Sequence, residues 1–454
     1  MTQSIQSNRL GTEPIVPLLF KLAIPSILSM FIQALYNVVD SVFVAKISED
    51  ALAALSLAFP IQMVLIAIGV GTGIGTSSLI SRLLGAGNNK RASSVAEHVL
   101  CIAVFYGIFI GICGIFFSKH FISIFTNDPT LIDYGSCYIK IILIGSTSLF
   151  LPMISNNILR GEGNTFIPMI TMLIGSILNI ILDPLFIFGY GFFPKLGIEG
   201  AAIATVLSRI ISGTFILLVL FKGNHQIKLT FRDFSFDLSI IKGIYQVGFP
   251  AMTMQILASF MIAGFNAILS SYGGTAIAAL GIYFRLQSFV FMPVFGLNQG
   301  YMPIIGYNYG HNNPERMKKT MKFAFIIAFV FTFLGFLLLQ VFPKELIKMF
   351  NDSPKLLEIG TNALKTISLA FPIIGPAIIG STTFQAIGKG LPSLILSFCR
   401  QIILLLPLAF IFVKIGGLHL IWYSFPISEI ISAVLMVFWL NKTLKKVFLK
   451  MHSI

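Results

Sequence analysis

The chain has 454 residues, of which 56% are hydrophobic and only 11% are charged, and its mean hydropathy is +0.90. A soluble protein of this size needs far more polar surface, so the composition excludes that class and indicates a polytopic membrane protein. The formal net charge of +14 is explained by membrane orientation, as shown below, and no nucleic-acid partner is expected.

Twelve apolar runs follow one another along the chain, each long enough to cross a bilayer. The N-terminus before them is polar, so we expect no cleavable signal peptide, and the four cysteines lie in or beside apolar runs without metal-ligand spacing. The sequence therefore predicts an all-α membrane protein with twelve transmembrane helices, at residues 17–45, 52–81, 94–117, 134–157, 164–188, 198–221, 239–271, 277–306, 318–341, 358–384, 391–414 and 417–440.

The basic residues are distributed unevenly between the loops. Of the 31 Lys and Arg, 19 lie in the N-terminal segment, the even-numbered loops and the C-terminal tail, whereas the odd-numbered loops hold 7. Because loops rich in Lys and Arg stay on the cytoplasmic side, both termini are predicted to be cytoplasmic.

The two halves of the chain repeat each other. The segment "ALAALSLAF" at 51–59 returns as "AIAALGIYF" at 276–284, and the same offset of 225 takes Pro25 to Pro250. Each half has an even number of spans, so the halves share one orientation, and parallel repeats of this kind are typical of transporters whose substrate path lies between them. We predict two pseudo-symmetric six-helix bundles: an N-terminal lobe at 1–221, a cytoplasmic connector at 222–238 and a C-terminal lobe at 239–454.

Three acidic residues lie well inside apolar runs, namely Asp40, Asp183 and Glu429. Each costs about 2.5–3.5 kcal/mol at a helix centre, so each must face protein or water. Asp40 and Asp183 lie five residues before the ends of outward-running spans, and Thr205 lies seven residues after the start of the next span. At about 1.5 Å per residue, all three are predicted at similar depth in the first lobe.

Further polar groups are expected beside these carboxylates. Four-residue spacing places Asn179 on the helix face of Asp183, and Tyr36 on that of Asp40. Pro184 cannot donate to the carbonyl group four residues earlier, which leaves that oxygen free. Such a set of hard oxygen ligands suits a proton or a small cation such as Na⁺, so we expect a coupling-ion site. The alternative is a structural pair, in which Asp183 bonds Asn179 to support helix packing.

The second lobe does not repeat this set, because Phe265 aligns with Asp40 and Leu406 aligns with Asp183. The intramembrane acid of the second lobe, Glu429, aligns with Arg209 of the first lobe. An acid near intramembrane arginines favours a structural ion pair, and the alternative is a role in substrate binding or proton relay. The candidate cations are Arg209, Arg285 and Arg400.

Several segments together resemble the multidrug and toxic compound extrusion (MATE) family, nearest to its bacterial MepA/DinF-like branch. They are "PSILSMFIQALYNVVDSVFVAKI", "ALAALSLAFP", "SRLLGAGN", "LRGEGNTFIPM", "LNIILDPLFIFGYG", "GAAIATVLSR" and "FPISE", and the resemblance covers nearly the whole chain. It implies two six-helix bundles around a V-shaped cavity, in the bacterial inner (plasma) membrane. The function it implies is export of organic cations, cationic aromatic drugs by default, driven by entry of Na⁺ or H⁺.

The resemblance also implies roles for single residues. The ion site would consist of Asp40, Asn179, Asp183 and Thr205, and helix 1 would bend at Pro25. Another branch of the family carries acids in helices 7 and 10, which this chain lacks there. We expect no cofactor besides the coupling ion, small-molecule drugs and membrane lipid as partners, and a monomer.

Two other functions remain open from sequence. A lipid-linked oligosaccharide flippase of the same superfamily fold would need a more cationic cavity, to which Arg209, Arg285 and Arg400 could contribute. An intramembrane aspartyl protease would use Asp40 and Asp183 as a dyad, but such enzymes carry a GxGD motif and here Asp183 follows "IIL". We therefore expect a cation/drug antiporter and not an enzyme.

Overall fold

The computed structural model describes residues 9–191, 193–223, 225–232 and 234–452. The first eight residues of the polar N-terminal segment, and residues 224 and 233 of the expected connector, lie outside this part. Within it, every regular element is a helix and no strand occurs. Ten helices are long and apolar enough to cross a membrane, and two bent helix pairs raise the number of spans to as many as twelve. The predicted fold class is confirmed.

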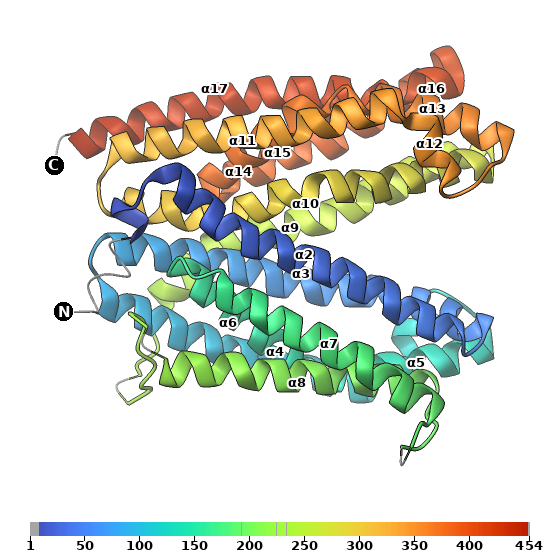
Figure 1. Ribbon diagram of the computed structural model, residues 1–454, viewed down its shortest axis with the longest axis horizontal. Helices are drawn as coiled ribbons and strands as arrows, with labels where there is room; N and C mark the ends of the chain where they lie inside the picture. The colour runs from blue at the N-terminus through green and yellow to red at the C-terminus, as the bar shows by residue number, and fades with distance from the viewer. Residues whose placement is uncertain (1–8, 192, 224, 233, 453–454) are drawn as a thin grey trace.

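The first bundle contains the elements α2 to α8 (Figure 1). Its bent pair, α5 and α6, forms the fourth span with an angle of 49° between the two helices. The bounds are α2 (Ile15–Ala45), α3 (Glu49–Gly85), α4 (Asn89–Ser123), α5 (Pro129–Ile144), α6 (Thr147–Gly161), α7 (Phe166–Phe188) and α8 (Ile198–Lys222).

The second bundle contains the remaining elements, and its tenth span bends by 50° between α13 and α14. This bend lies at the position in the repeat that is equivalent to the bend in the fourth span. The bounds are α9 (Leu238–Leu269), η1 (Ser270–Tyr272), α10 (Gly274–Gly310), α11 (Pro314–Val341), α12 (Pro343–Lys348), α13 (Pro354–Ser368), α14 (Phe371–Ala386), α15 (Gly390–Phe398), the π-helical turn η2 (Cys399–Leu405), α16 (Leu406–Ile421) and α17 (Ser424–His452).

The last two spans depart from their predicted bounds. The sequence places a break between 414 and 417, and the backbone does turn there, because Gly417 has φ +63° and interrupts α16. The chain then resumes a helical turn up to Ile421 before α17 begins at Ser424. An apolar pattern locates the glycine break but cannot reveal this added turn.

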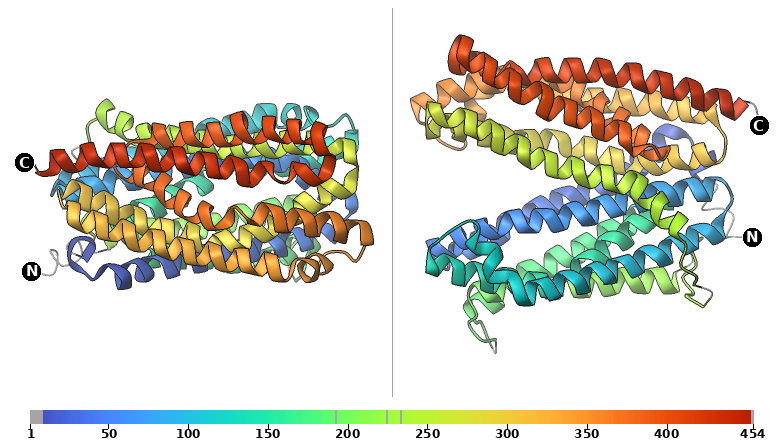
Figure 2. Two further views of the ribbon diagram at one scale, coloured as in Figure 1. Left: turned by 90° about the horizontal axis from the view of Figure 1, so that it is seen from above. Right: turned by 180° about the vertical axis from the view of Figure 1, so that it is seen from behind.

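The two bundles lie side by side, closest near the end of the molecule that carries both termini (Figures 1 and 2). We call this the terminal end, and the opposite end the far end. The bundles diverge toward the far end in Figure 1 and in the right view of Figure 2.

Glycines permit the close approach of the bundles at the terminal end. A Cβ atom on Gly71 of α3 would lie 2.2 Å from Met252 of α9, and one on Gly296 of α10 would lie 2.3 Å from Ile27 of α2. Gly71 corresponds to Gly296, and Ile27 to Met252, through the repeat offset of 225. The interface is therefore pseudo-symmetric.

A second pair of glycine contacts obeys the same symmetry. A Cβ atom on Gly85 would lie 2.0 Å from the Tyr307 carbonyl oxygen, and one on Gly310 would lie 2.0 Å from the Arg82 carbonyl oxygen. Backbone meets backbone at both places, so no side chain can be inserted there without moving the bundles apart.

The segment between α8 and α9 is fastened to the first bundle. Glu162 accepts a hydrogen bond from the Ile227 amide (2.8 Å), and Glu97 accepts one from the Thr230 amide (3.1 Å). His225 lies 3.3 Å from the Glu162 carboxylate, and the hydrogen bond between them raises the pKa of His225. The connector is thus tied to the ends of α4 and α6 before it leads into α9.

Candidate functional site

Buried polar side chains from three helices meet inside the first bundle. Asp183 and Asn179 lie one turn apart on α7, and Thr205 lies on α8; all three are buried, Asp183 completely. The Asn179 amide nitrogen donates to Asp183 Oδ1 (3.2 Å) and shares a contact of 3.3 Å with Thr205 Oγ1. One side-chain amide therefore joins α7 to α8.

The third helix, α2, adds Asp40 and Tyr36 to this cluster. Asp40 and Asp183 lie close enough for the charge of one carboxylate to act on the other, and Tyr36 lies beside Thr205. Two neighbouring carboxylates repel each other when both are ionised, so this arrangement favours a proton on one of them or a cation beside them. The structure brings together all five residues that the sequence placed at this depth.

Three oxygen atoms of the cluster are buried without a donor from the described residues. They are Asp40 Oδ1, Asn179 Oδ1 and Asp183 Oδ2. Buried polar atoms are ordinarily paired, and leaving them unpaired costs free energy. No group of three or more His, Cys, Asp or Glu that could hold a metal ion occurs in the described part of the chain. Two carboxylates with amide and hydroxyl oxygens instead fit a proton or a hard monovalent cation.

The two prolines singled out from sequence lie within unbroken helices. α7 continues through Pro184 to Phe188, so the free carbonyl expected beside Asp183 is not accompanied by an opened backbone. α2 likewise continues through Pro25 to Ala45. Bending of α2 at Pro25 stays a prediction for a different conformation.

Arg209 belongs to this cluster, which sequence reasoning missed. It follows Thr205 by one turn of α8, is partly buried, and its charge acts on Asp40 and Tyr36. Four-residue spacing from Thr205, applied as it was to Asn179 and Tyr36, would have indicated it.

The second bundle is filled by aromatic rings at the equivalent place. Phe265 is fully buried and packs on Phe425 with ring centroids 4.8 Å apart. Phe265 corresponds to Asp40 through the offset of 225, and Phe425 corresponds to Thr205 through the offset of 220 that relates the sixth span to the twelfth. The oxygen-rich cluster is therefore confined to the first bundle.

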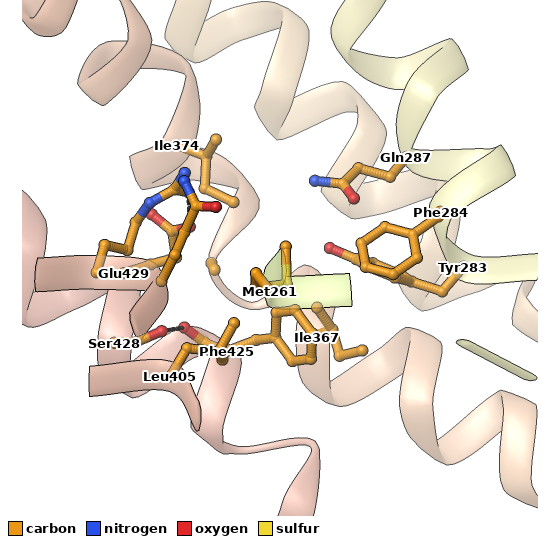
Figure 3. Close-up of a pocket in the computed structure, with 13 residues that line it drawn as sticks. Met261, Tyr283, Phe284, Gln287, Ile367, Ile374, Leu405, Phe425, Ser428 and Glu429 are labelled. Atoms are coloured by element: carbon orange, nitrogen blue, oxygen red, sulfur yellow. Dashed lines mark hydrogen bonds and ion pairs between the residues drawn. The ribbon is translucent and has the colours of Figure 1, made fainter. Parts of the chain in front are cut away.

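Glu429 of the second bundle pairs with Arg400. The guanidinium of Arg400, on the π-helical turn η2, donates to the buried Glu429 carboxylate on α17. A cavity of about 40 Å³ adjoins the pair, and Tyr283 and Gln287 of α10 point into it (Figure 3). Arg209 and Arg285 take no part in this ion pair among the described contacts.

Comparison with known proteins settles the family. The MatE family model matches residues 25–185 and 250–411, one match in each half of the chain. The chain belongs to the MATE family. This MATE protein is 30% identical to a probable multidrug resistance protein NorM of Thermotoga maritima, with 97% of this chain and 96% of the relative covered. It is 27% identical to the multidrug export protein MepA of Staphylococcus haemolyticus, with 92% and 91% covered.

A third relative has a different substrate in its name. The FAD transporter of Shewanella oneidensis is 28% identical, with 93% of each chain covered. Among solved structures, an outward-facing multidrug resistance MATE transporter aligns with a TM-score of 0.88 at 30% identity, covering 95% of this chain and 96% of that one. A MOP superfamily transporter from Pyrococcus furiosus aligns with a TM-score of 0.90 at 29% identity, covering 98% of each. The protein is therefore a multi-pass membrane transporter and not an enzyme, and the protease alternative is excluded.

Proposed function

We propose that this MATE protein is a secondary active efflux transporter that exports organic compounds, cationic aromatic drugs by default, in exchange for H⁺ or Na⁺. Family membership and the relatives named as multidrug exporters support the drug-efflux part. The observation that carries the coupling part is the set of buried oxygen atoms of Asp40, Asn179 and Asp183 that no described donor satisfies, and that a proton or a cation would satisfy.

Helix α2 supplies a physical link between this ion site and the opening between the bundles. Asp40 lies near its far end, whereas Ile27, at its terminal half, packs against Gly296 of the second bundle. Pro25 lies beside that contact, at a position where the helix lacks one backbone hydrogen bond. Binding or release of a cation at Asp40 changes the charge that α2 must bury, and bending at Pro25 would transmit this change to the interface.

The distribution of the arginines argues against the flippase alternative. Arg400 is neutralised by Glu429, and Arg209 acts on Asp40, so both are balanced by nearby acids. Only Arg285 of the three candidate cations remains to offer charge to a substrate. A pyrophosphate-linked carrier would favour a cluster of cations, because each phosphate group is bound best by several donors.

Transport by purified protein in proteoliposomes tests the proposed function. Counterflow of a fluorescent organic cation is followed with a Na⁺ gradient and a pH gradient imposed separately, and at least one gradient should drive export. Asp183→Asn and Asp40→Asn should insert normally, since neutralising an intramembrane acid removes a cost, and both should lose gradient-driven export. Glu199→Gln, at the edge of the membrane, is the matched control and should export normally. Wild-type export by well-folded Asp183→Asn protein would remove the carboxylate from the mechanism.

A further inference from the structure

One face of α10 continues from the interface between the bundles toward the far end. Gly296 and Gly300 of this helix pack against Ile27 and Leu22 of α2. Arg285 precedes Gly296 by eleven residues, which is about three helical turns, so it lies on the same face. At that level the bundles have diverged, and Arg285 is exposed. Its side chain therefore lies on the side of α10 that faces the first bundle, and not in the core of the second bundle.

The neighbours of Arg285 on this face agree with that placement. Phe289, one turn closer to the interface, leaves 56% of its surface exposed. One turn in the other direction, a Cβ atom built on Gly281 would meet nothing within 4 Å. Open space thus lies one turn from Arg285 on one side, and an exposed aromatic ring lies one turn away on the other.

Helix α9 presents a similar face. Gly248 packs against Gly71 of the first bundle. Gln255 and Ser259 follow Gly248 by seven and eleven residues, or about two and three turns, so they continue its face, and both are exposed. We call Gln255, Ser259, Arg285 and Phe289 the second-bundle wall. Faces turned to lipid elsewhere carry large apolar side chains, such as Phe105 and Ile108 of α4.

The opposite wall is apolar. Val64 precedes Gly71 by seven residues on α3, and Val38 follows Ile27 by eleven residues on α2, so both continue the faces that meet the second bundle. Both valines are exposed. Asp183 is fully buried, and Glu429 is paired with Arg400. Asp40 follows Ile27 by 13 residues, which turns it away from the α2 face that meets the second bundle, and its Oδ1 atom is buried in the first bundle. None of the three intramembrane acids is therefore placed to balance Arg285.

An intramembrane arginine is costly unless it faces water or a counter-ion. Arg285 has no hydrogen bond or ion pair among the interactions of the residues that the structure describes, and therefore gives the space between the bundles an unbalanced positive charge. Guanidinium groups bind carboxylates in a bidentate manner, and they do so most strongly where water is partly excluded.

We propose that Arg285 binds a carboxylate of the transported compound, so that aromatic zwitterions and anions are preferred to purely cationic analogues. The ring of such a compound fits between Phe289 and the apolar wall. This inference rests on the proposed function, because it assumes that the space between the bundles is the transport path. It replaces the default of purely cationic drugs with aromatic compounds that carry a carboxylate.

The test compares two dyes that differ only in the carboxylate. Tetramethylrhodamine has a free carboxylate, and its methyl ester does not. Equilibrium binding to purified protein is measured by fluorescence anisotropy, and export is measured in proteoliposomes. Wild-type protein should bind the acid more tightly than the ester. Arg285→Gln should weaken binding of the acid by about tenfold or more and leave the ester unchanged or improved, as expected for loss of a charge-assisted bidentate contact.

Two further variants distinguish the effect of a positive charge at position 285 from the effect of removing any exposed positive charge. Arg285→Lys keeps the cation and should retain most of the preference for the acid. Lys140→Gln removes an exposed cation from α5, which packs mainly against α3, α4 and α8 of the first bundle, and should leave the acid-to-ester ratio unchanged.

The outcomes distinguish this inference from the proposed function. Three results would overturn the role of Arg285, even if ion gradients drive export of other compounds. The wild type could bind the ester as tightly as the acid or more tightly, Arg285→Gln could leave the acid-to-ester ratio of affinities unchanged, or the protein could bind neither dye. Arg285-dependent binding of the acid without gradient-driven export of any dye would keep the binding site and overturn the ion-coupled function.

Discussion

Arg400 and Glu429 form the ion pair that joins the π-helical turn η2 to α17 in the second bundle. The Glu429 side chain is 9% exposed and that of Arg400 is 32% exposed, so the pair is buried on one side only. Removing either partner leaves the other charge in a region of low dielectric constant. The cost of breaking such a pair usually exceeds the net stability that the intact pair provides.

We predict that Glu429→Gln lowers the stability of the protein without abolishing transport. The expected loss is about 1–3 kcal/mol, below the range for a fully buried pair because Arg400 is partly exposed. Thermal unfolding in detergent and export in proteoliposomes measure the two properties. Arg400→Gln combined with Glu429→Gln should cost less than the sum of the single changes, since no charge is left alone. A Glu429→Gln protein of normal stability that no longer transports would instead place this acid in the mechanism.

Single residues could be predicted from sequence where helix spacing alone decides their positions. Depth and four-residue spacing brought Asp40, Asn179, Asp183 and Thr205 to one place, although their role in coupling stays a prediction. The partner of Glu429 could not be chosen among three arginines. That choice depends on η2, where a π-helical turn sets the direction of the Arg400 side chain, and apolar periodicity does not reveal such a turn.

At the scale of elements, the glycines of α3 and α10 set how closely the bundles approach. Gly85→Ala would place a Cβ atom 2.0 Å from the Tyr307 carbonyl oxygen, an overlap that only movement of the helices can relieve. We predict a lower melting temperature and faster hydrogen–deuterium exchange in the α3 residues that face α10. The stability of the contact comes from backbone packing, so no side-chain rotation compensates.

Gly111→Ala in α4 is the control for this prediction. A Cβ atom on Gly111 would lie 3.5 Å from its nearest neighbouring atom, which is an ordinary van der Waals contact. Alanine also favours a helix more than glycine does. This variant should be as stable as the wild type or slightly more stable. Equal effects of the two substitutions would show that the contact at Gly85 does not hold the bundles together.

The positions of elements were easier to predict than their breaks. All twelve apolar runs correspond to helices or to bent helix pairs, because hydrophobic length is set by the bilayer. The bends in the fourth and tenth spans were not predicted. Gly145 is the C-cap of α5, and Pro372 is the second residue of α14. Single Gly and Pro residues also occur inside unbroken helices such as α2 and α7. Tertiary packing decides which of them interrupts a helix.

At the scale of the whole molecule, the repeat explains the arrangement of the two bundles but not why their polar residues differ. The offset of 225 relates Gly71 to Gly296 and Gly85 to Gly310 across the interface. The same repeat holds acids in the first bundle and an exposed Arg285 on the second-bundle wall. Sequence alone could not assign Arg285 to that wall, because faces toward lipid and faces toward the other bundle are both exposed. The interface contacts were needed to tell them apart.

The repeat and the charge distribution also predict how the molecule is oriented. The turns between α3 and α4 and between α10 and α11 lie at the terminal end with both termini (Figure 1). Asn88 and Asn313 cap the following helices there, accepting from the Arg91 and Arg316 amides at 3.1 and 3.0 Å. Replacing these caps would itself cost about 1 kcal/mol, so labels belong on the neighbouring exposed positions Lys90 and Glu315.

We predict that Lys90→Cys and Glu315→Cys are inaccessible from outside intact cells. Met349→Cys, at the far end and 79% exposed, should react with a membrane-impermeant maleimide added to intact cells. The other two should react only after the membrane is opened, because the Lys- and Arg-rich ends of the spans remain in the cytoplasm. The wild type, with its own four cysteines, gives the background. Labelling of Lys90→Cys from outside, with Met349→Cys protected, would invert the topology and place the diverging end of the bundles toward the cytoplasm. The ion driving export would then have to bind from the opposite side, and the direction of transport proposed for this protein would be reversed.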